Sequence, residues 1–88
     1  MPEISRFFGM VIIMHWKEQE HNPPHFHAVY GDDEAIIDIN KLELISGKLS
    51  RRALTMVLEW AKEHRDELLK DWELCQNNQK PNKIEPLQ

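Results

Sequence analysis

Short apolar runs separated by polar turns make up the first half of the chain. Residues 7–14 are apolar at nearly every position, as expected of a β-strand that is covered on both faces. Asn22-Pro23-Pro24 then interrupts regular structure, and strand-like runs follow at residues 25–30, 35–39 and 42–45. The pattern predicts an antiparallel four-stranded sheet over about residues 5–46.

The spacing of apolar residues changes after Ser50 to the roughly 3.6-residue period of an α-helix. Ser50 is the expected N-cap, because its hydroxyl can accept an otherwise unpaired backbone N–H. Pro81 and Pro86 exclude a regular helix from the last residues. We therefore predict a single domain, 1–88, of the α+β class. It has the four strands, one long amphipathic helix (50–77) packed on the apolar face of the sheet, and an irregular tail (78–88).

Burial selects a register for the hairpin of residues 25–30 and 35–39. A four-residue turn, 31–34, sets Ala28 opposite Ile37 and gathers apolar side chains on one face. A slip of one residue would set Phe26 against Asp38, which places a carboxylate beside a buried ring. We therefore favour the four-residue turn.

The same register predicts a polar group on the second face of the sheet. His27 lies opposite Asp38, and His25 lies opposite Asn40. A short turn after residue 39 would bring Glu43 beside Asp38. Two imidazoles and a carboxylate on neighbouring strand positions are the strongest indication of chemistry in this sequence.

This group allows three interpretations. His25, His27 and Asp38, with His21 from the preceding loop, are suitable ligands for a divalent transition metal. The imidazoles could instead act as catalytic acid and base, with Asp38 orienting His27. In the third interpretation the same residues form a structural His–Asp pair on a solvated strand.

Two further sets of residues suggest binding. Lys48, Arg51 and Arg52 precede or begin the expected helix, where backbone amides also attract anions, so they form a candidate anion-binding site. Phosphate or the carboxylates of a partner are the candidate ligands. Apolar residues that border the histidines are candidate partner-binding residues; these are Val29, Ile36 and Ile45. Trp60 fits a core anchor, but because it lies off the main helical stripe it is also a candidate partner-binding residue.

Composition and charge narrow the classes of function. The 88 residues allow one core, and no apolar run approaches the ~20 residues of a membrane span. No export signal is visible, and the single cysteine, Cys75, cannot form an internal disulfide, so we expect a cytoplasmic protein without a membrane partner. The net charge of −4 disfavours general nucleic-acid binding, so RNA would have to be presented to the protein.

Several segments resemble one family. They are Ile4-Ser5-Arg6-Phe7-Phe8-Gly9, His21-Asn22-Pro23-Pro24-His25-Phe26-His27-Ala28, Ile37-Asp38-Ile39, Gly47-Lys48-Leu49, Arg51-Arg52-Ala53-Leu54 and Glu59-Trp60. Over nearly its whole length the chain resembles the small bacterial proteins grouped as domain of unknown function 4160. The resemblance implies a short cytosolic protein, often encoded beside a second small domain in an arrangement like a toxin–antitoxin pair. It also implies His25, His27 and Asp38 as one site and Arg51-Arg52 as another.

Three hypotheses follow for the function. The first is an interaction module that forms one half of a toxin–antitoxin-like pair with a small protein encoded nearby; self-association is compatible with so short a chain. The second is a small ribonuclease-type phosphodiester enzyme with His25 and His27 as acid and base, and Arg51 and Arg52 on the phosphate. The third is a metal-binding domain.

Overall fold

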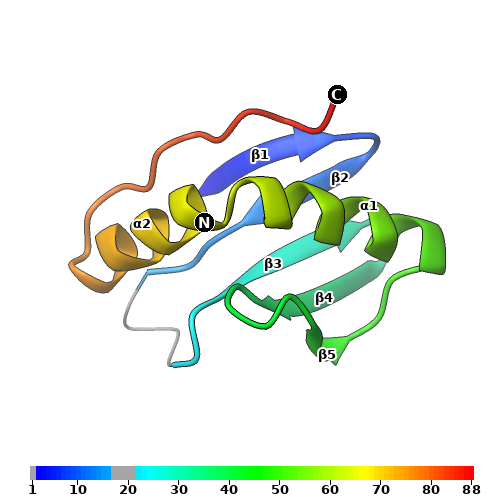
Figure 1. Cartoon of the computed structure of the whole chain (residues 1–88), viewed down its shortest axis with the longest axis horizontal. Helices are drawn as coiled ribbons and strands as arrows, with labels where there is room; N and C mark the ends of the chain where they lie inside the picture. Colours follow the sequence, from blue (N-terminus) through cyan, green and yellow to red (C-terminus); the bar gives the residue numbers. More distant parts are fainter. Residues whose placement is uncertain (1, 17–21) are drawn as a thin grey trace.

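The computed structural model describes residues 2–16 and 22–88 and has an α+β fold (Figure 1). Its five antiparallel strands lie in the order β1-β2-β3-β4-β5. The antiparallel α+β prediction is confirmed, but the predicted four strands and single helix are wrong. The elements are β1 (Glu3–Phe7), β2 (Met10–Ile13), β3 (His25–Tyr30), β4 (Asp33–Asp38), β5 (Leu44–Gly47), α1 (Arg51–Glu63) and α2 (Arg65–Gln76).

The apolar segment that we predicted as one strand contains the hairpin between β1 and β2. Phe7 pairs with Met10, which leaves Phe8 and Gly9 as a two-residue turn. Both turn residues have positive φ angles, 48° at Phe8 and 84° at Gly9. A turn of this kind follows the twist of antiparallel strands, and it usually carries Asn or Gly at its first position. The phenylalanine at that position hid the turn from the sequence pattern.

β3 and β4 pair two positions away from the predicted register. Tyr30 lies opposite Asp33, so the turn has two residues rather than four. Because side chains alternate between the faces of a strand, a shift of two positions leaves each side chain on the same face. The histidines and Asp38 therefore share a face, but Asp38 lies opposite His25 and not His27.

β5 begins two residues later than predicted, because Asp38 organises a turn at the end of β4. Its carboxylate Oδ1 accepts the backbone N–H of Lys41 at 2.8 Å. Its carbonyl oxygen accepts the backbone N–H of Leu42 at 2.9 Å. These bonds hold residues 41 and 42 out of the strand. β5 starts at Leu44, and its pairing with β4 shifts by one residue between the Leu44–Ile37 and Ser46–Ile36 pairs.

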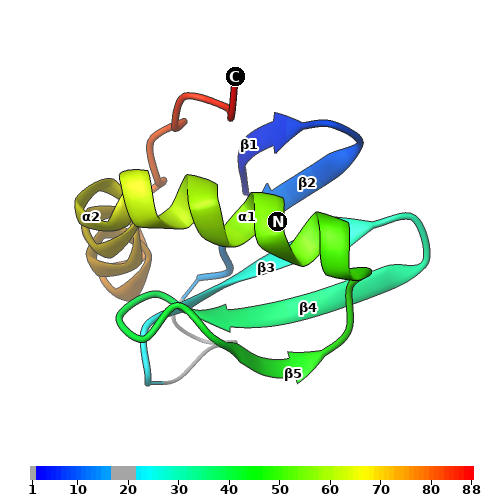
Figure 2. The same cartoon turned by 45° about the vertical axis from the view of Figure 1, so that its right-hand side comes forward.

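Two helices replace the predicted long one. Ser50 is the N-cap of α1, as predicted, and its hydroxyl accepts the N–H of Ala53. The helix is interrupted at His64, which has φ −117° and ψ 23°. α2 then runs in a different direction from α1 (Figure 2). The break brings Trp72 of α2 to the start of β3, where its ring lies 5.0 Å from that of His25.

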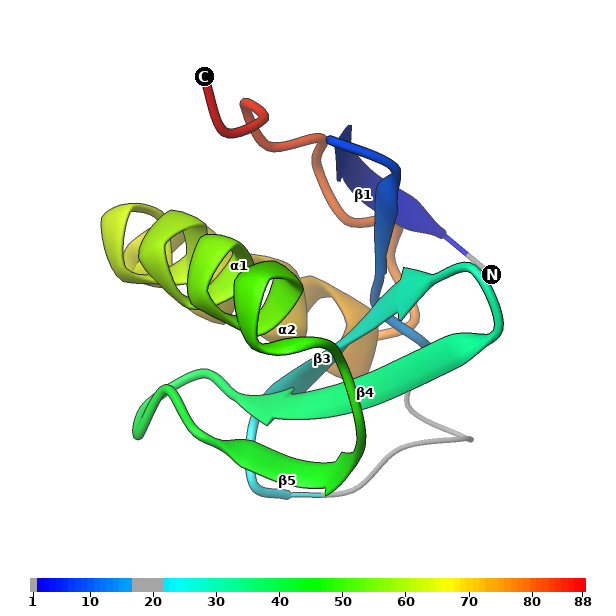
Figure 3. The same cartoon turned by 90° about the vertical axis from the view of Figure 1, so that its right-hand side faces the viewer.

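The α1 helix lies on one face of the sheet, as the side view in Figure 3 shows, while α2 extends past the sheet near the start of β3. Buried side chains of this face pack against α1, and the rings of Phe26 and Trp60 meet edge to face at 5.8 Å. The main residues of this core are Ile4, Met10, Ile12, Met14, Phe26, Ala28, Ile37, Ile39, Val57, Trp60 and Leu68. We call the opposite side of the sheet the second face.

The tail lies alongside β1 (Figure 1). The backbone N–H of Ile84 donates to the carbonyl oxygen of Ile4 at 2.8 Å. Ile84 is itself buried, as is Pro81. The tail thus covers the outer edge of β1 and adds apolar side chains to the core, although it has no regular secondary structure.

Candidate functional site

The second face carries the predicted histidine cluster. His25, His27 and Asp38 are buried there, with 6%, 7% and 6% of their surfaces exposed. The imidazole rings of His25 and His27 lie 5.5 Å apart. The ring of His15, at the end of β2, stands edge-on to His27 at 4.5 Å. Three of the four histidines in the described part of the chain therefore lie together, and His15 is a member that strand alternation alone did not identify.

Among the described residues, the carboxylate that contacts His27 is that of Glu34, and Asp38 makes no such contact. Glu34 Oε2 lies 2.8 Å from His27 Nδ1. The Nδ1 atom of His25 lies 2.8 Å from the carbonyl oxygen of Pro23. The predicted orientation of His27 by Asp38 is therefore wrong. A two-residue turn, for which Gly31-Asp32 is a suitable sequence, would have placed Glu34 near His27.

The predicted metal site is not assembled by the residues that the structure describes. Across residues 2–16 and 22–88, no group of three histidine, cysteine or acidic side chains could hold an ion. His21, the fourth predicted ligand, lies outside the described residues. The metal hypothesis is thus supported only by the residue types of the proposed ligands, and His25 and His27 already contact other groups.

The candidate anion-binding residues lie where β5 leads into α1. Lys48, Arg51 and Arg52 are exposed. Lys48 Nζ is 3.9 Å from Asp33 Oδ1, a distance at the limit of an ion pair. No ion pair involves Arg51 or Arg52 within the described part of the chain. Arg52 also lines a surface cavity with the exposed rings of Phe8 and Tyr30.

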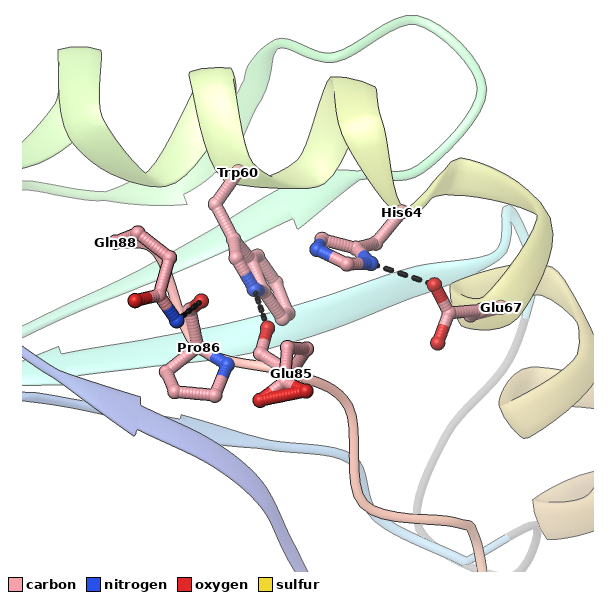
Figure 4. Close-up of polar contacts among 6 residues, drawn as sticks. All are labelled: Trp60, His64, Glu67, Glu85, Pro86 and Gln88. Atoms are coloured by element: carbon pink, nitrogen blue, oxygen red, sulfur yellow. Dashed lines mark hydrogen bonds and ion pairs between the residues drawn. The ribbon is translucent and has the colours of Figure 1, made fainter.

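Of the two interpretations of Trp60, the core anchor is confirmed and the partner-binding residue is wrong. Its side chain is completely buried. Its indole N–H donates to the carbonyl oxygen of Glu85 at 2.8 Å, so Trp60 anchors the tail (Figure 4). The apolar stripe of α1 is wider than we predicted because the tail covers its flank. His64, next to Trp60 in Figure 4, contacts the carboxylate of Glu67.

The other predicted partner residues differ in accessibility. Val29 and Ile36 are half-buried, whereas Ile45 is 46% exposed and its neighbour Leu44 is 41% exposed. Leu44 and Ile45 belong to β5, the last strand of the sheet, in which all four residues are exposed. Among the described residues, β5 pairs with β4 alone, so its outer edge is open.

A buried polar group also lies beneath the tail. Asp71 Oδ1 accepts the backbone N–H of Asn82 at 2.9 Å, while its Oδ2 is buried without a hydrogen-bond partner in the described structure. Burial raises the pKa of Asp71; the bond from Asn82 opposes this effect, and the charge of Glu67 adds to it. Burial, with a smaller contribution from Asp71, raises the pKa of the Cys75 thiol to about 11. Cys75 is therefore a protonated thiol near neutral pH and a poor nucleophile.

Comparisons with known proteins identify the family. Searches of curated proteins and of solved structures give no match. No helix in the described part of the chain has the length and apolar character needed to cross a membrane. The model of the family described as domain of unknown function (DUF4160) matches residues 9–73, which is most of the chain and includes β2 to β5, α1 and the histidine cluster. The chain therefore belongs to the DUF4160 family.

Proposed function

We propose that this protein is a cytoplasmic interaction module that binds a second small protein, as one half of a toxin–antitoxin-like pair. The observation that carries the proposal is the open edge of β5. Unpaired strand edges can bind an extended segment of another chain, which adds a strand to the sheet. The described structure has one such edge, because the tail covers β1.

The backbone of β5 supports this mode of binding. At one end the N–H of Lys48 bonds to β4, and at the other the C=O of Glu43 accepts an N–H from β4. In an antiparallel ladder, adjacent residues direct their backbone groups to opposite edges. Glu43 and Lys48 both face β4 although they are five positions apart, because the register shifts within β5. Counted from each end of the strand, the N–H and C=O groups of Leu44 and Gly47 should therefore point outward, where a partner strand can bond to them.

The side chains of β5 also favour a protein partner. Leu44 and Ile45 present apolar surface, and β5 contains no charged residue or proline, so its protection as an edge strand is limited to its four-residue length and the register shift beside Ile36. Backbone hydrogen bonds provide affinity in this mode, and side chains provide specificity. Ile45, a predicted partner-binding residue, keeps that role, and Leu44 joins it.

The histidine cluster gives weaker support to the enzyme hypothesis. A general acid or base must come within hydrogen-bond reach of its substrate. His25 and His27 are only 6% and 7% exposed, and each Nδ1 already has an oxygen within 2.8 Å. Their contacts with Pro23 and Glu34 favour the structural interpretation, in which the imidazoles join β3 to its neighbours.

Co-expression with the protein encoded beside it tests the proposal. The wild-type chain should co-elute with that protein as a stable complex. The double substitution Leu44→Lys and Ile45→Lys should weaken binding about tenfold or more, because it removes apolar contact and adds two charges to the edge. A matched control adds the same charge at the exposed positions Thr55 and Gln79 (Thr55→Lys with Gln79→Lys) and should bind normally.

Two outcomes would contradict the proposal. The two wild-type proteins could elute independently, or the Leu44 and Ile45 double variant could bind as tightly as the control variant. Light scattering on the isolated chain adds a third comparison. A dimer that this double variant dissociates would assign β5 to self-association instead of to a second protein.

A further inference from the structure

A surface cavity of the described structure lies at the opposite end of the sheet from the α2 helix, and neither the family nor the proposed partner accounts for it. It is open to solvent, has a volume of about 440 Å³, and lies between the β1–β2 turn, the end of β3 and the start of α1. This volume is within the ~300–1,000 Å³ range of sites for small molecules. The lining residues are Phe8, Tyr30, Ser50, Arg52, Ala53 and Met56.

Two exposed aromatic rings form part of the cavity wall. Phe8 is 59% exposed and Tyr30 is 42% exposed. The Tyr30 ring lies against the β1–β2 turn, since a Cβ added to Gly9 would be 3.1 Å from Tyr30 Cε1. Exposed rings at the mouth of a cavity are suited to stack on a planar ligand.

The backbone at Phe8 is unfavourable for the residue it carries. Its φ of +48° is uncommon for a bulky side chain, and Asn or Gly would fit the same turn better. The ring meets that of Phe7 edge to face at 6.5 Å, but the residue remains 59% exposed, so burial offsets little of this cost. Phenylalanine therefore contributes little to folding at this position, whereas contact with a ligand would use its exposed ring.

The charge beside the rings is positive. Arg52 lines the cavity, with Arg51 and Lys48 nearby in sequence. The chain has 15 acidic and 11 basic residues, yet no carboxylate forms an ion pair with Arg51 or Arg52 in the described structure. The first turn of α1 also contains no acidic residue. The acidic residues of the neighbouring turn and strand are Asp32, Asp33 and Glu34, of which Asp33 approaches Lys48 and Glu34 contacts His27.

We infer that this cavity binds a nucleoside phosphate. The base would stack on Phe8 and Tyr30, the apolar side chains of Ala53 and Met56 would contact the base or the sugar, and Arg52 would bind the phosphate through charge-assisted hydrogen bonds. Two exposed rings favour a flat base over the apolar side chain of an acidic peptide. A single nucleotide also avoids the repulsion that a net charge of −4 imposes on a long polyanion. This inference is independent of the partner at β5.

Titration of the full-length chain by NMR tests the inference, with 5′-AMP, adenosine and inorganic phosphate as separate probes. AMP should give saturable shifts of the amides of residues 8–10, 30 and 50–56, and should bind about tenfold or more tightly than adenosine or phosphate alone. Arg52→Gln and Phe8→Asn should each weaken AMP binding about tenfold. Lys62→Gln, on an exposed part of α1, is the charge-matched control for Arg52→Gln and should leave AMP binding unchanged.

Phe8→Asn distinguishes loss of AMP binding from loss of stability. Asparagine suits the turn, so this variant should have an equal or higher melting temperature. If this variant does not fold, Tyr30→Leu makes the same test from the other ring. Absence of saturable AMP shifts would overturn the inference. So would equal affinity for AMP and phosphate, normal AMP binding by the ring variant, or an acidic peptide that shifts these amides where AMP does not. Loss of AMP binding would leave partner binding at β5 intact.

Discussion

The two outer edges of the sheet, formed by β1 and β5, differ in what covers them. The tail covers the edge of β1, where Ile84 bonds to Ile4 and Trp60 bonds to Glu85. No described segment pairs with the outer edge of β5, and all four of its residues are exposed. One edge thus belongs to the core of the protein, and the other remains available for contact.

The difference shows how a short chain can combine a stable core with a strand edge that is available for binding. A chain of this length buries a limited fraction of its surface, so an irregular tail that adds buried side chains has a large effect. An open edge strand invites aggregation, and limiting β5 to four residues reduces that risk. Stability should therefore depend on the β1 side of the sheet, and binding on the β5 side.

The largest expected effect comes from removing equivalent aliphatic side chains at the two edges. Ile84→Ala should lower the free energy of unfolding by about 2–5 kcal/mol, because Ile84 is only 4% exposed. Leu44→Ala should lower it by about 0.5 kcal/mol or less, because Leu44 is 41% exposed. Urea denaturation of both variants and the wild type measures the difference.

For binding to the partner protein in the co-elution assay, we expect the opposite ranking of the two variants. Leu44→Ala should weaken the complex, whereas folded Ile84→Ala protein should bind normally. Equal losses of stability at the two positions would remove the distinction between a structural edge and a binding edge.

A smaller effect tests whether β5 is held firmly enough against β4 to pair with a strand of the partner protein. Gly47 has φ +83°, and a Cβ there would lie 2.1 Å from the carbonyl oxygen of Glu34. Gly47→Ala should therefore lower the free energy of unfolding by about 2 kcal/mol, partly from the left-handed conformation and partly from displacement of β5 from β4.

Gly31→Ala is the matched control for this steric contact. Gly31 also has a positive φ, +62°, but a Cβ there would meet nothing within 4 Å. This variant should lose only the conformational part, about 1 kcal/mol. If Gly47→Ala costs no more than Gly31→Ala, then β5 moves away from β4 easily and is not a preformed template.

Sequence patterns predicted the faces of the strands better than their connections. Alternation alone placed His25, His27 and Asp38 on one face, because a register error of two positions does not change parity. The carboxylate partner of His27 was missed because it depends on turn length. The β1–β2 turn was missed because Phe8 is not a typical residue for it.

Contacts between distant parts of the chain were not predictable from local patterns. Nothing near Trp60 in the sequence indicates that residue 85 covers it, so a buried anchor resembled an exposed tryptophan. The openness of β5 likewise depends on where the tail lies. The helix break at His64 was hidden for a similar reason, since the apolar spacing continues from α1 into α2.

The smallest expected effect is a pH dependence of stability at the edge of β1, which the tail covers. Burial raises the pKa of Asp71 in the folded protein, so folding favours the protonated carboxyl. Its contribution to stability is therefore complete below the unfolded pKa and is lost as pH rises through the folded pKa. Each pKa unit of difference corresponds to about 1.4 kcal/mol. The tail should thus be held less firmly at neutral pH than at mildly acidic pH.

Asp71→Asn should remove this dependence, because asparagine cannot ionise but still offers an oxygen to the N–H of Asn82. Urea denaturation between about pH 4 and pH 7 should show that the variant gains stability relative to the wild type as pH rises. Asp66→Asn removes an exposed charge one turn earlier on α2 and should give a profile parallel to the wild type. Parallel profiles for Asp71→Asn as well would mean that the charged carboxylate is tolerated under the tail, and that the closed edge of the sheet is not sensitive to pH.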